Sequence, residues 1–172
     1  MNKVVEELRT KETPFSEQVI SQLPYLNACF KETLRLHPPA PFLLPHFAPE
    51  TCEVMNYTVP KNSRVFVNVW AIGRDPTFWE DPLLFKPDRF LGSNLEFKGH
   101  DFEFLPFGSG RRICPGLMMG SKQVLLIMAN LVRFFDWSLP NNDDPGDLDM
   151  GERLGITMQK EQPLLLIPKI KI

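Results

Sequence analysis

Seventeen prolines are spread through the 172 residues of this chain, about twice the usual frequency of proline in globular proteins. Proline lacks a backbone N–H and clashes with the preceding helical turn, so it limits where a helix or a central strand can run. These prolines stand between apolar segments rather than in one cluster. The chain is therefore expected to form short elements separated by many turns.

Hydrophobic periodicity predicts helices in the intervals between prolines. Pro24 suits a first helical turn, and the helix that it begins is expected to end near Leu36, before Pro38 and Pro39. Shorter helices are expected over residues 2–9 and 16–23. The longest periodic stretch is residues 117–135. Its expected apolar stripe consists of Leu117, Val124, Ile127, Met128, Leu131 and Phe135.

Short strands are expected elsewhere. Arg64–Val69 alternates as a half-buried strand should, and Phe42–Leu44 is a second candidate. Cys52–Val54 and Tyr57–Val59 flank Met55-Asn56, which predicts a tight hairpin. Residues 70–107 are expected to be mostly irregular. The remaining expected strands are Ile156–Met158 and Leu164–Pro168, paired as a terminal β-hairpin.

Composition narrows the class of protein but not its activity. Hydrophobic residues make up 43% of the chain and charged residues 23%, which excludes a disordered protein. The net charge of −2 provides no strong positive field with which to hold nucleic acid. The charged amino-terminal residues do not form a signal peptide. The longest apolar run, residues 124–129, is too short to span a bilayer, so no anchor is expected within this chain.

The three cysteines, Cys29, Cys52 and Cys114, include no CxxC pair, which argues against a disulfide framework or a structural zinc site. Cys114 lies in a glycine-rich loop directly before the longest helix, beside Arg111 and Arg112. A helix N-terminus and nearby positive charge favour a thiolate over a thiol. Such a thiolate can serve as a nucleophile or as a metal ligand. For a lone cysteine at a helix start, however, a buried structural thiol is the commoner role.

The residues around Cys114 form a specific pattern. Phe107, Gly110, Arg112, Cys114 and Gly116 follow the order Phe-x-x-Gly-x-Arg-x-Cys-x-Gly, which resembles the haem-ligand signature of the cytochrome P-450 monooxygenases. The two glycines allow a tight loop and a close approach of the backbone to a flat ligand. The resemblance implies that Cys114 is the axial thiolate ligand of the iron in haem b. It also implies that Phe107 shields the sulfur and that Arg112 pairs with a haem propionate.

Two further elements resemble the same family. Glu32 and Arg35 match its Glu-x-x-Arg motif, and residues three apart on a helix share one face and can pair. Taken alone, such a pair is an ordinary solvated ion pair. The segment 87–90, Pro-Asp-Arg-Phe, matches the family's Pro-x-Arg-Phe element. The resemblance implies that Arg89 joins Glu32 and Arg35 in a buried structural network.

The implied fold class is α+β, mainly α, and corresponds to the carboxy-terminal third of the cytochrome P-450 fold. It comprises the Glu-x-x-Arg helix, small β-sheets, the Cys-ligand loop, the long following helix and a terminal β-hairpin. Residues 1–172 are thus expected to be one partial domain. The family's long central helix, whose acid/alcohol pair delivers protons to bound oxygen, has no match here. No catalytic residue is therefore assigned, and the chain alone is expected to be inactive.

The resemblance also implies a substrate class and partners. His46 matches a position where the family places a propionate-binding Arg or His, although the sequence alone favours a surface histidine. Substrate contacts are implied for four apolar residues. The implied activity is hydroxylation of a small hydrophobic substrate with O₂ and electrons from an NADPH–cytochrome reductase. The four implied contact residues are Phe42, Leu43, Leu44 and Ile156.

Two segments resemble the plant microsomal branch of the family, residues 69–76 and 101–107. Residues 147–150 and 155–160 resemble geraniol hydroxylases, which implies a monoterpenoid substrate. The parent protein would lie on the cytosolic face of the endoplasmic reticulum membrane. Two alternatives remain open. One is an inactive fragment without stable haem binding, and the other is a haem-thiolate isomerase or dehydratase, which the intact Cys114 loop disfavours.

Overall fold

The computed structural model describes residues 2–10, 15–155 and 157–171, so the expectation for Ile156 lies outside the described residues. Five α-helices, eight strands and four short 3₁₀ turns are present within these ranges. The helices are α1 (Asn2–Arg9), α2 (Glu17–Ser21), α3 (Pro24–Leu36), α4 (Val69–Ile72) and α5 (Leu117–Phe134). The 3₁₀ turns are η1 (Pro87–Phe90), η2 (Gly110–Arg112), η3 (Pro140–Asn142) and η4 (Pro145–Asp147).

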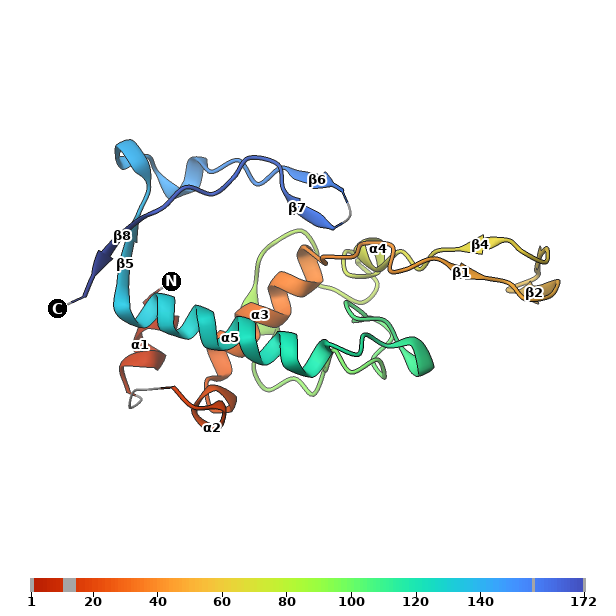
Figure 1. Cartoon of the computed structure of the whole chain (residues 1–172), viewed down its shortest axis with the longest axis horizontal. Helices are drawn as coiled ribbons and strands as arrows, with labels where there is room; N and C mark the ends of the chain where they lie inside the picture. The colour runs from red at the N-terminus through yellow and green to blue at the C-terminus, as the bar shows by residue number, and fades with distance from the viewer. Residues whose placement is uncertain (1, 11–14, 156, 172) are drawn as a thin grey trace.

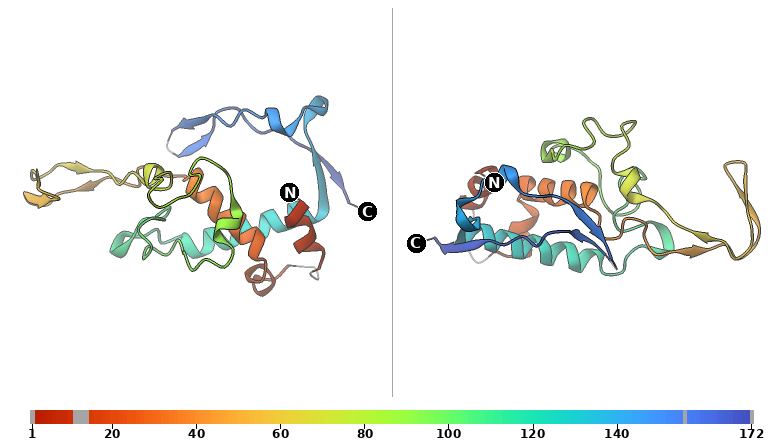
Figure 2. Two further views of the ribbon diagram at one scale, coloured as in Figure 1. Left: turned by 180° about the vertical axis from the view of Figure 1, so that it is seen from behind. Right: turned by 90° about the horizontal axis from the view of Figure 1, so that it is seen from above.

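The described strands form four two-stranded antiparallel sheets. In Figure 1, β1, β4 and the β2–β3 hairpin form an arm at one end of the molecule, and the two further views in Figure 2 show the same arm projecting from the helices. The pairs are β1 (His46–Phe47) with β4 (Arg64–Val65), β2 (Cys52–Val54) with β3 (Tyr57–Val59), β5 (Phe135–Ser138) with β8 (Ile167–Ile170), and β6 (Glu152–Leu154) with β7 (Met158–Lys160).

Helix α3 has the bounds that the sequence predicts, and β2 and β3 form the predicted hairpin. The α3 helix begins at Pro24, and the His37 amide donates the capping hydrogen bond to the Thr33 carbonyl. In the hairpin, Met55 and Asn56 both have positive φ angles, 50° and 65°. That conformation belongs to the type I′ turn, whose twist matches that of the two flanking strands.

The main hydrophobic core lies where α1, α2 and α3 pack against the second half of α5, as Figure 1 shows. Leu8, Leu23 and Ala129 are fully buried there. Burial of these side chains stabilises α1 and α2, which are too short to persist as isolated helices in water. The core residues are Val4, Leu8, Phe15, Ile20, Leu23, Leu26, Leu125, Ala129 and Val132.

The expected apolar stripe on α5 was wrong in its orientation. The helix buries Leu117, Ser121, Leu125, Ala129 and Val132, and of these only Leu117 belonged to the expected stripe. Val124, Ile127 and Met128 are 45%, 56% and 44% exposed. Apolar residues surround most of this helix, so periodicity alone does not choose a face. By length and composition α5 is also the one described helix that could cross a membrane.

Two expected strands also differ. Phe42–Leu44 is a turn, because the Leu43 amide donates to the Ala40 carbonyl at 3.0 Å and Leu43 has a φ of 51°. The strand expected over Arg64–Val69 ends at Val65, because β1 provides partners for two residues only. Helix α4 then begins after Asn68, whose side chain accepts a hydrogen bond from the Ala71 amide.

The expected terminal hairpin pairs differently from the prediction. Strand β7 pairs with β6 across a turn closed by the Gly155 amide and the Thr157 carbonyl, 3.1 Å apart. Strand β8 instead pairs with β5, which directly follows α5. The last strand therefore ties the end of the described chain to the long helix.

The packing of α5 predicts unequal effects for two residues of the same size on opposite faces of this helix. Leu125→Ala should lower the free energy of unfolding by about 2–5 kcal/mol, because it leaves a cavity in the core. Ile127→Ala removes the same number of carbon atoms from the exposed face and should change it by about 0.5 kcal/mol or less. Urea unfolding of the 172-residue chain, followed by circular dichroism, measures both. A greater loss for Ile127→Ala would contradict this packing.

Candidate functional site

The loop that carries Cys114 is a compact ring of hydrogen bonds at the start of α5. The Cys114 amide donates to the Phe107 carbonyl at 3.0 Å, and inside this ring the Ile113 amide donates to the Gly110 carbonyl at 3.2 Å. The Leu117 amide then donates to the Cys114 carbonyl at 3.3 Å, which joins the loop to the helix. The Cys114 side chain is half-buried and its thiol is free. The fold thus presents this sulfur at the N-terminus of its longest helix.

Two glycines lie in this loop, one on each side of Cys114 in the sequence. Gly110 has a φ of 63°, a conformation that side chains with a Cβ rarely adopt. At Gly116, a Cβ would meet one described atom within 4 Å, the Cys114 sulfur at 3.8 Å. Gly116 therefore places no side chain against the Cys114 sulfur.

Aromatic rings support the loop from behind. Phe107 is half-buried and meets Phe97 edge to face, with ring centroids 5.7 Å apart. Phe97 in turn meets Phe30 of α3 edge to face at 5.8 Å. Such perpendicular pairs are favourable and fix the relative orientation of the rings. Helix α3 therefore contacts the Cys114 loop through two aromatic side chains.

The structure brings some of the other expected site residues to this loop and not others. Leu43 lies against it, because its Cδ1 is 3.4 Å from the Cβ position of Gly108. Phe42 and Leu44 are exposed, and Phe42 stacks edge to face on Phe66. Arg112 is exposed and makes no hydrogen bond or ion pair within the described residues. His46 is exposed in β1. Among the residues that the structure describes, no hydrogen bond joins its side chain to the Cys114 loop.

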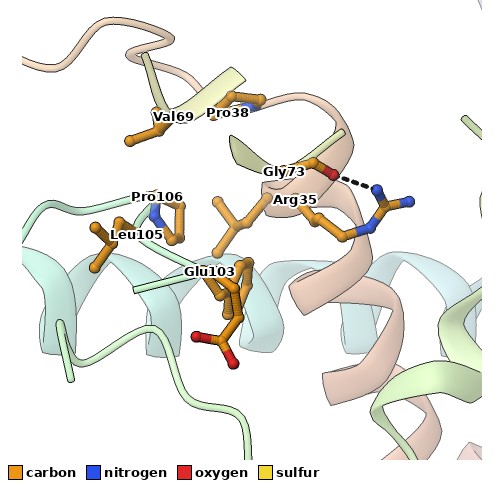
Figure 3. Close-up of a pocket in the computed structure, with 9 residues that line it drawn as sticks. Arg35, Pro38, Val69, Gly73, Glu103, Leu105 and Pro106 are labelled. Carbon is orange, nitrogen blue, oxygen red and sulfur yellow. Dashed lines mark hydrogen bonds between the residues drawn. The ribbon is translucent and has the colours of Figure 1, made fainter. Parts of the chain in front are cut away.

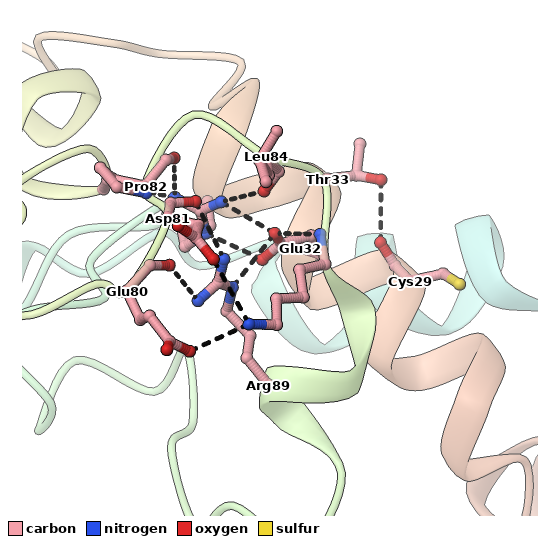
Figure 4. A network of polar contacts seen from close by, with 11 residues as sticks. Cys29, Glu32, Thr33, Glu80, Asp81, Pro82, Leu84 and Arg89 are labelled. Atoms are coloured by element: carbon pink, nitrogen blue, oxygen red, sulfur yellow. Dashed lines mark hydrogen bonds and ion pairs between the residues drawn. The ribbon is translucent and has the colours of Figure 1, made fainter.

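Glu32 and Arg35 of α3 meet Arg89 of η1 in one network of hydrogen bonds, in which Figure 4 shows Glu32 and Arg89. Glu32 and Arg35 are fully buried. Arg35 donates two hydrogen bonds to the Glu32 carboxylate, Nε to Oε2 and Nη2 to Oε1, both 2.8 Å long. Arg89 Nε lies 3.2 Å from the same Oε1, which also accepts the Lys86 amide at 2.7 Å. The single negative charge is thus shared by two guanidinium groups and one backbone donor.

The remaining guanidinium donors reach backbone carbonyls of the irregular segment 73–84. Arg35 donates to the carbonyls of Gly73, Pro82 and Leu84. Its guanidinium carbon also lies 5.1 Å from the centre of the Trp79 ring, a cation–π contact. Arg89 donates hydrogen bonds to two more carbonyls in the same segment, those of Glu80 and Asp81. No buried side-chain nitrogen or oxygen lacks a partner in the described part of the chain.

A small cavity adjoins this network (Figure 3). It has room for about one water molecule at most, so it cannot hold an organic substrate. A Cβ at Gly73 would collide with the Arg35 carbonyl oxygen, so the backbone on that side is packed directly on α3. The cavity is lined by Leu34, Arg35, Pro38, Val69, Gly73, Glu103, Phe104, Leu105 and Pro106.

Sequence reasoning missed a polar cluster centred on Glu152 of β6. His37 caps the carboxyl end of α3, and its Nδ1 lies 2.5 Å from Glu152 Oε1. Trp70 Nε1 donates to Glu152 Oε2 at 3.2 Å, and the Arg74 guanidinium stacks 4.0 Å above the Trp70 ring. Burial lowers the pKa of Arg74, and the Glu152 carboxylate opposes that shift. The cluster joins the β6–β7 hairpin to α3 and α4, a pairing that no sequence spacing reveals.

The family profile and the similar curated proteins both assign this chain to one family. The profile of the Cytochrome P-450 family matches residues 1–167. An (S)-N-methylcoclaurine 3'-hydroxylase isozyme of Papaver somniferum is 54% identical over 92% of this chain and 33% of its own length. A geraniol 8-hydroxylase of Swertia mussotii is 55% identical over 86% of this chain and 30% of its own length. The chain thus spans about a third of the curated relatives that it matches.

Solved structures give the same answer for the fold. A zebrafish cytochrome P-450 solved with progesterone superposes with a TM-score of 0.80 and 32% identity, over 98% of this chain and 37% of that one. Another zebrafish cytochrome P-450 structure, with abiraterone, gives a TM-score of 0.83 and 31% identity, over 98% and 40%. These matches confirm the α+β, mainly α fold class and the resemblance stated from the sequence.

The burial of Glu32 predicts a large effect of removing its charge. Glu32→Gln keeps the size of the side chain but leaves two buried guanidinium groups without a counter-charge, so it should cost about 3–5 kcal/mol of stability. Glu80→Gln is the matched control, because Glu80 is 81% exposed and pairs with Lys86 at the surface. It should leave the unfolding midpoint close to that of the wild type. Urea unfolding compares the two, and equal effects would contradict a structural role for the buried carboxylate.

Proposed function

The chain belongs to the cytochrome P-450 family, and from this premise we propose that Cys114 is the thiolate ligand of a haem iron in a monooxygenase. The observation that supports this most directly is the Cys114 loop itself. It holds a free, half-buried thiol at the start of α5. Gly116, whose Cβ position lies 3.8 Å from the sulfur, places no side chain against it.

The residues present fit a haem group. A thiolate is a suitable axial ligand for haem iron, and a flat macrocycle needs neighbours that lack side chains, as Gly110 and Gly116 do. Arg112 is exposed and unpaired within the described residues, so its guanidinium is available for a propionate. His46 would be the second propionate contact.

Each of these residues has a definite task in the proposed site. The loop hydrogen bonds around Cys114 hold the backbone that carries the sulfur in one position. Phe107, whose ring is fixed against Phe97, would shield the sulfur, as the family resemblance implies. When bound, haem b would supply the oxygen chemistry, with O₂ and with electrons from an NADPH–cytochrome reductase.

The substrate we propose is a small hydrophobic molecule such as a monoterpenoid. Leu43 lies against the Cys114 loop, and Phe42 and Leu44 are exposed beside it, so this turn can offer an apolar wall. The family resemblance implies Ile156 as a further substrate contact. Relatives named geraniol 8-hydroxylase and iridoid oxidase support this substrate class. By the same relationship we place the parent protein on the cytosolic face of the endoplasmic reticulum membrane.

Glu32, Arg35 and Arg89 have a structural role in this proposal, not a catalytic one. Their donors and acceptors are directed to one another and to backbone groups. Neither Glu32 nor Arg35 is accessible to solvent. Their task is to fix the segment that leads to the Cys114 loop.

Replacement of single cysteines tests the assignment of the ligand. Haem is added to the 172-residue chain, and the reduced CO complex is recorded by absorption spectroscopy. Cys114→Ser should abolish the red-shifted Soret band that is typical of thiolate ligation, because serine provides no thiolate. Cys29→Ser and Cys52→Ser are the matched controls and should keep the band. A band that survives in Cys114→Ser, or that disappears in Cys52→Ser, would show that the assignment is wrong.

A second candidate function is that of an inactive fragment, and the exposed face of α5 favours it. Val124, Ile127 and Met128 form an apolar surface there that no described segment covers. Exposed apolar surface of this kind promotes association with other chains rather than a defined pocket. The chain also spans about a third of its curated relatives, and we find no match in it to the family's proton-delivering acid/alcohol pair.

Turnover by the 172-residue chain separates the two functions. With haem, a plant reductase, NADPH and geraniol, we expect no oxygenated product, because a positioned proton relay contributes roughly 10²–10⁴-fold to such reactions. Mass spectrometry detects the product, and an intact relative such as geraniol 8-hydroxylase serves as the positive control. A rate comparable with that of the relative would overturn the prediction of inactivity and support the monooxygenase directly.

A further inference from the structure

We propose that Gly99 and Ser109 form a brace that sets the position of the Cys114 loop, which makes Gly99 a positioning residue for the proposed cysteine ligand. The inference rests on the proposed function for the identity of the ligand, but the brace itself is a property of this chain. Neither residue belongs to the five-position pattern around Cys114. Gly99 lies eight residues before Phe107, in a segment that the sequence predicted only as irregular.

The backbone at Gly99 is in direct contact with the loop. A Cβ at this position would lie 2.9 Å from the Gly108 carbonyl oxygen and 2.9 Å from the Ser109 Cα. It would also lie 3.1 Å from Ile113 Cδ1. The first two neighbours are backbone atoms, which cannot swing away as a side chain can. Close-packed interiors transmit such overlaps as displacements of the backbone.

A hydrogen bond connects the same two segments. The Ser109 hydroxyl donates to the Gly99 carbonyl at 2.5 Å. One residue pair thus combines a steric limit with an attractive contact, so the distance between the two segments is fixed in both directions. Phe97, two residues earlier, supports Phe107 from the same segment.

The neighbours of Gly99 in the loop lie near both ends of the hydrogen-bonded ring from Phe107 to Cys114. That ring is closed by the hydrogen bond from the Cys114 amide to the Phe107 carbonyl. Gly108 follows Phe107 directly, and Ile113 directly precedes Cys114, so the contacts of Gly99 lie just inside each end of the ring. A displacement there changes the path of the backbone on which the sulfur is carried.

Gly99 has a second constraint, and Gly92 allows the two to be separated. Gly99 has a φ of 82°, which is strained for any residue with a Cβ. Gly92 has a φ of 71° but has no described atom within 4 Å of its Cβ position. Gly92→Ala therefore introduces similar backbone strain without the collision. It is the matched control for Gly99→Ala.

The three cysteines of the chain report the outcome without haem. Iodoacetamide labelling of the 172-residue chain, followed by peptide mass spectrometry, gives a separate rate for each thiol. Cys52 is exposed and serves as the reference. Cys29 is half-buried in α3, and burial raises the pKa of its thiol, so it labels slowly while the core is folded. Unfolding of the whole chain would accelerate Cys29, whereas a local disturbance would not.

We expect Gly99→Ala to raise the labelling rate of Cys114, relative to Cys52, by about threefold or more, with Cys29 unchanged. Gly92→Ala should leave the Cys114 rate at the wild-type value. Ser109→Ala removes the hydrogen bond without a collision and should give a smaller rise at Cys114 alone. This second variant keeps the proposal testable if Gly99→Ala destabilises the whole chain.

Two results would overturn the brace. One is a Cys114 rate in Gly99→Ala and Ser109→Ala that equals the rate in Gly92→Ala. The other is a parallel rise of Cys29 and Cys114 in both variants, which would make Gly99 a residue of the general fold. The haem spectrum of the wild-type chain is recorded separately. Absence of a thiolate-type band would count against the proposed function and leave the result for the brace unaffected.

Discussion

The buried carboxylate of Glu32 is the interaction on which the rest of this structure depends. A charge removed from water must be met by partners, and here these are Arg35, Arg89 and the Lys86 amide. The remaining guanidinium donors then bind carbonyl oxygens of the segment 73–84. That segment has little regular structure of its own, so arginine side chains replace the hydrogen-bond ladder of a sheet. Two side chains from α3 and η1 thereby order a long irregular stretch.

The ordered segment 73–84 is followed in the sequence by the aromatic residues that pack behind the Cys114 loop. Trp79, Phe90 and Phe104 pack together beside the two arginines, and Phe97 bridges Phe30 and Phe107. The loop therefore rests on aromatic rings behind it, on the Gly99–Ser109 contact at its flank and on Leu43 at its front. A loop that is held from several sides keeps its cysteine in one position before any metal-containing group binds.

Particular elements show how far the sequence could be followed. The bounds of α3 and the β2–β3 hairpin were predicted correctly, because proline positions and turn residues act locally. The buried face of α5 was predicted wrongly, since Val124, Ile127 and Met128 are as apolar as the residues that α1 to α3 cover. The turn at Leu43 and the pairing of β8 with β5 depend on distant partners. So does the bond between His37 and Glu152, which lie 115 residues apart.

The sequence by itself determined the family of this protein, the loop that carries Cys114 and the pairing of Glu32 with Arg35. Each of these is encoded within a few residues, where spacing along the chain fixes spacing in space. Only the tertiary structure decided which face of α5 is buried, how Arg89 reaches Glu32 and why position 99 has no room for a side chain. Those features depend on packing between segments far apart in the sequence, and close packing is a property of the assembled interior rather than of any single segment.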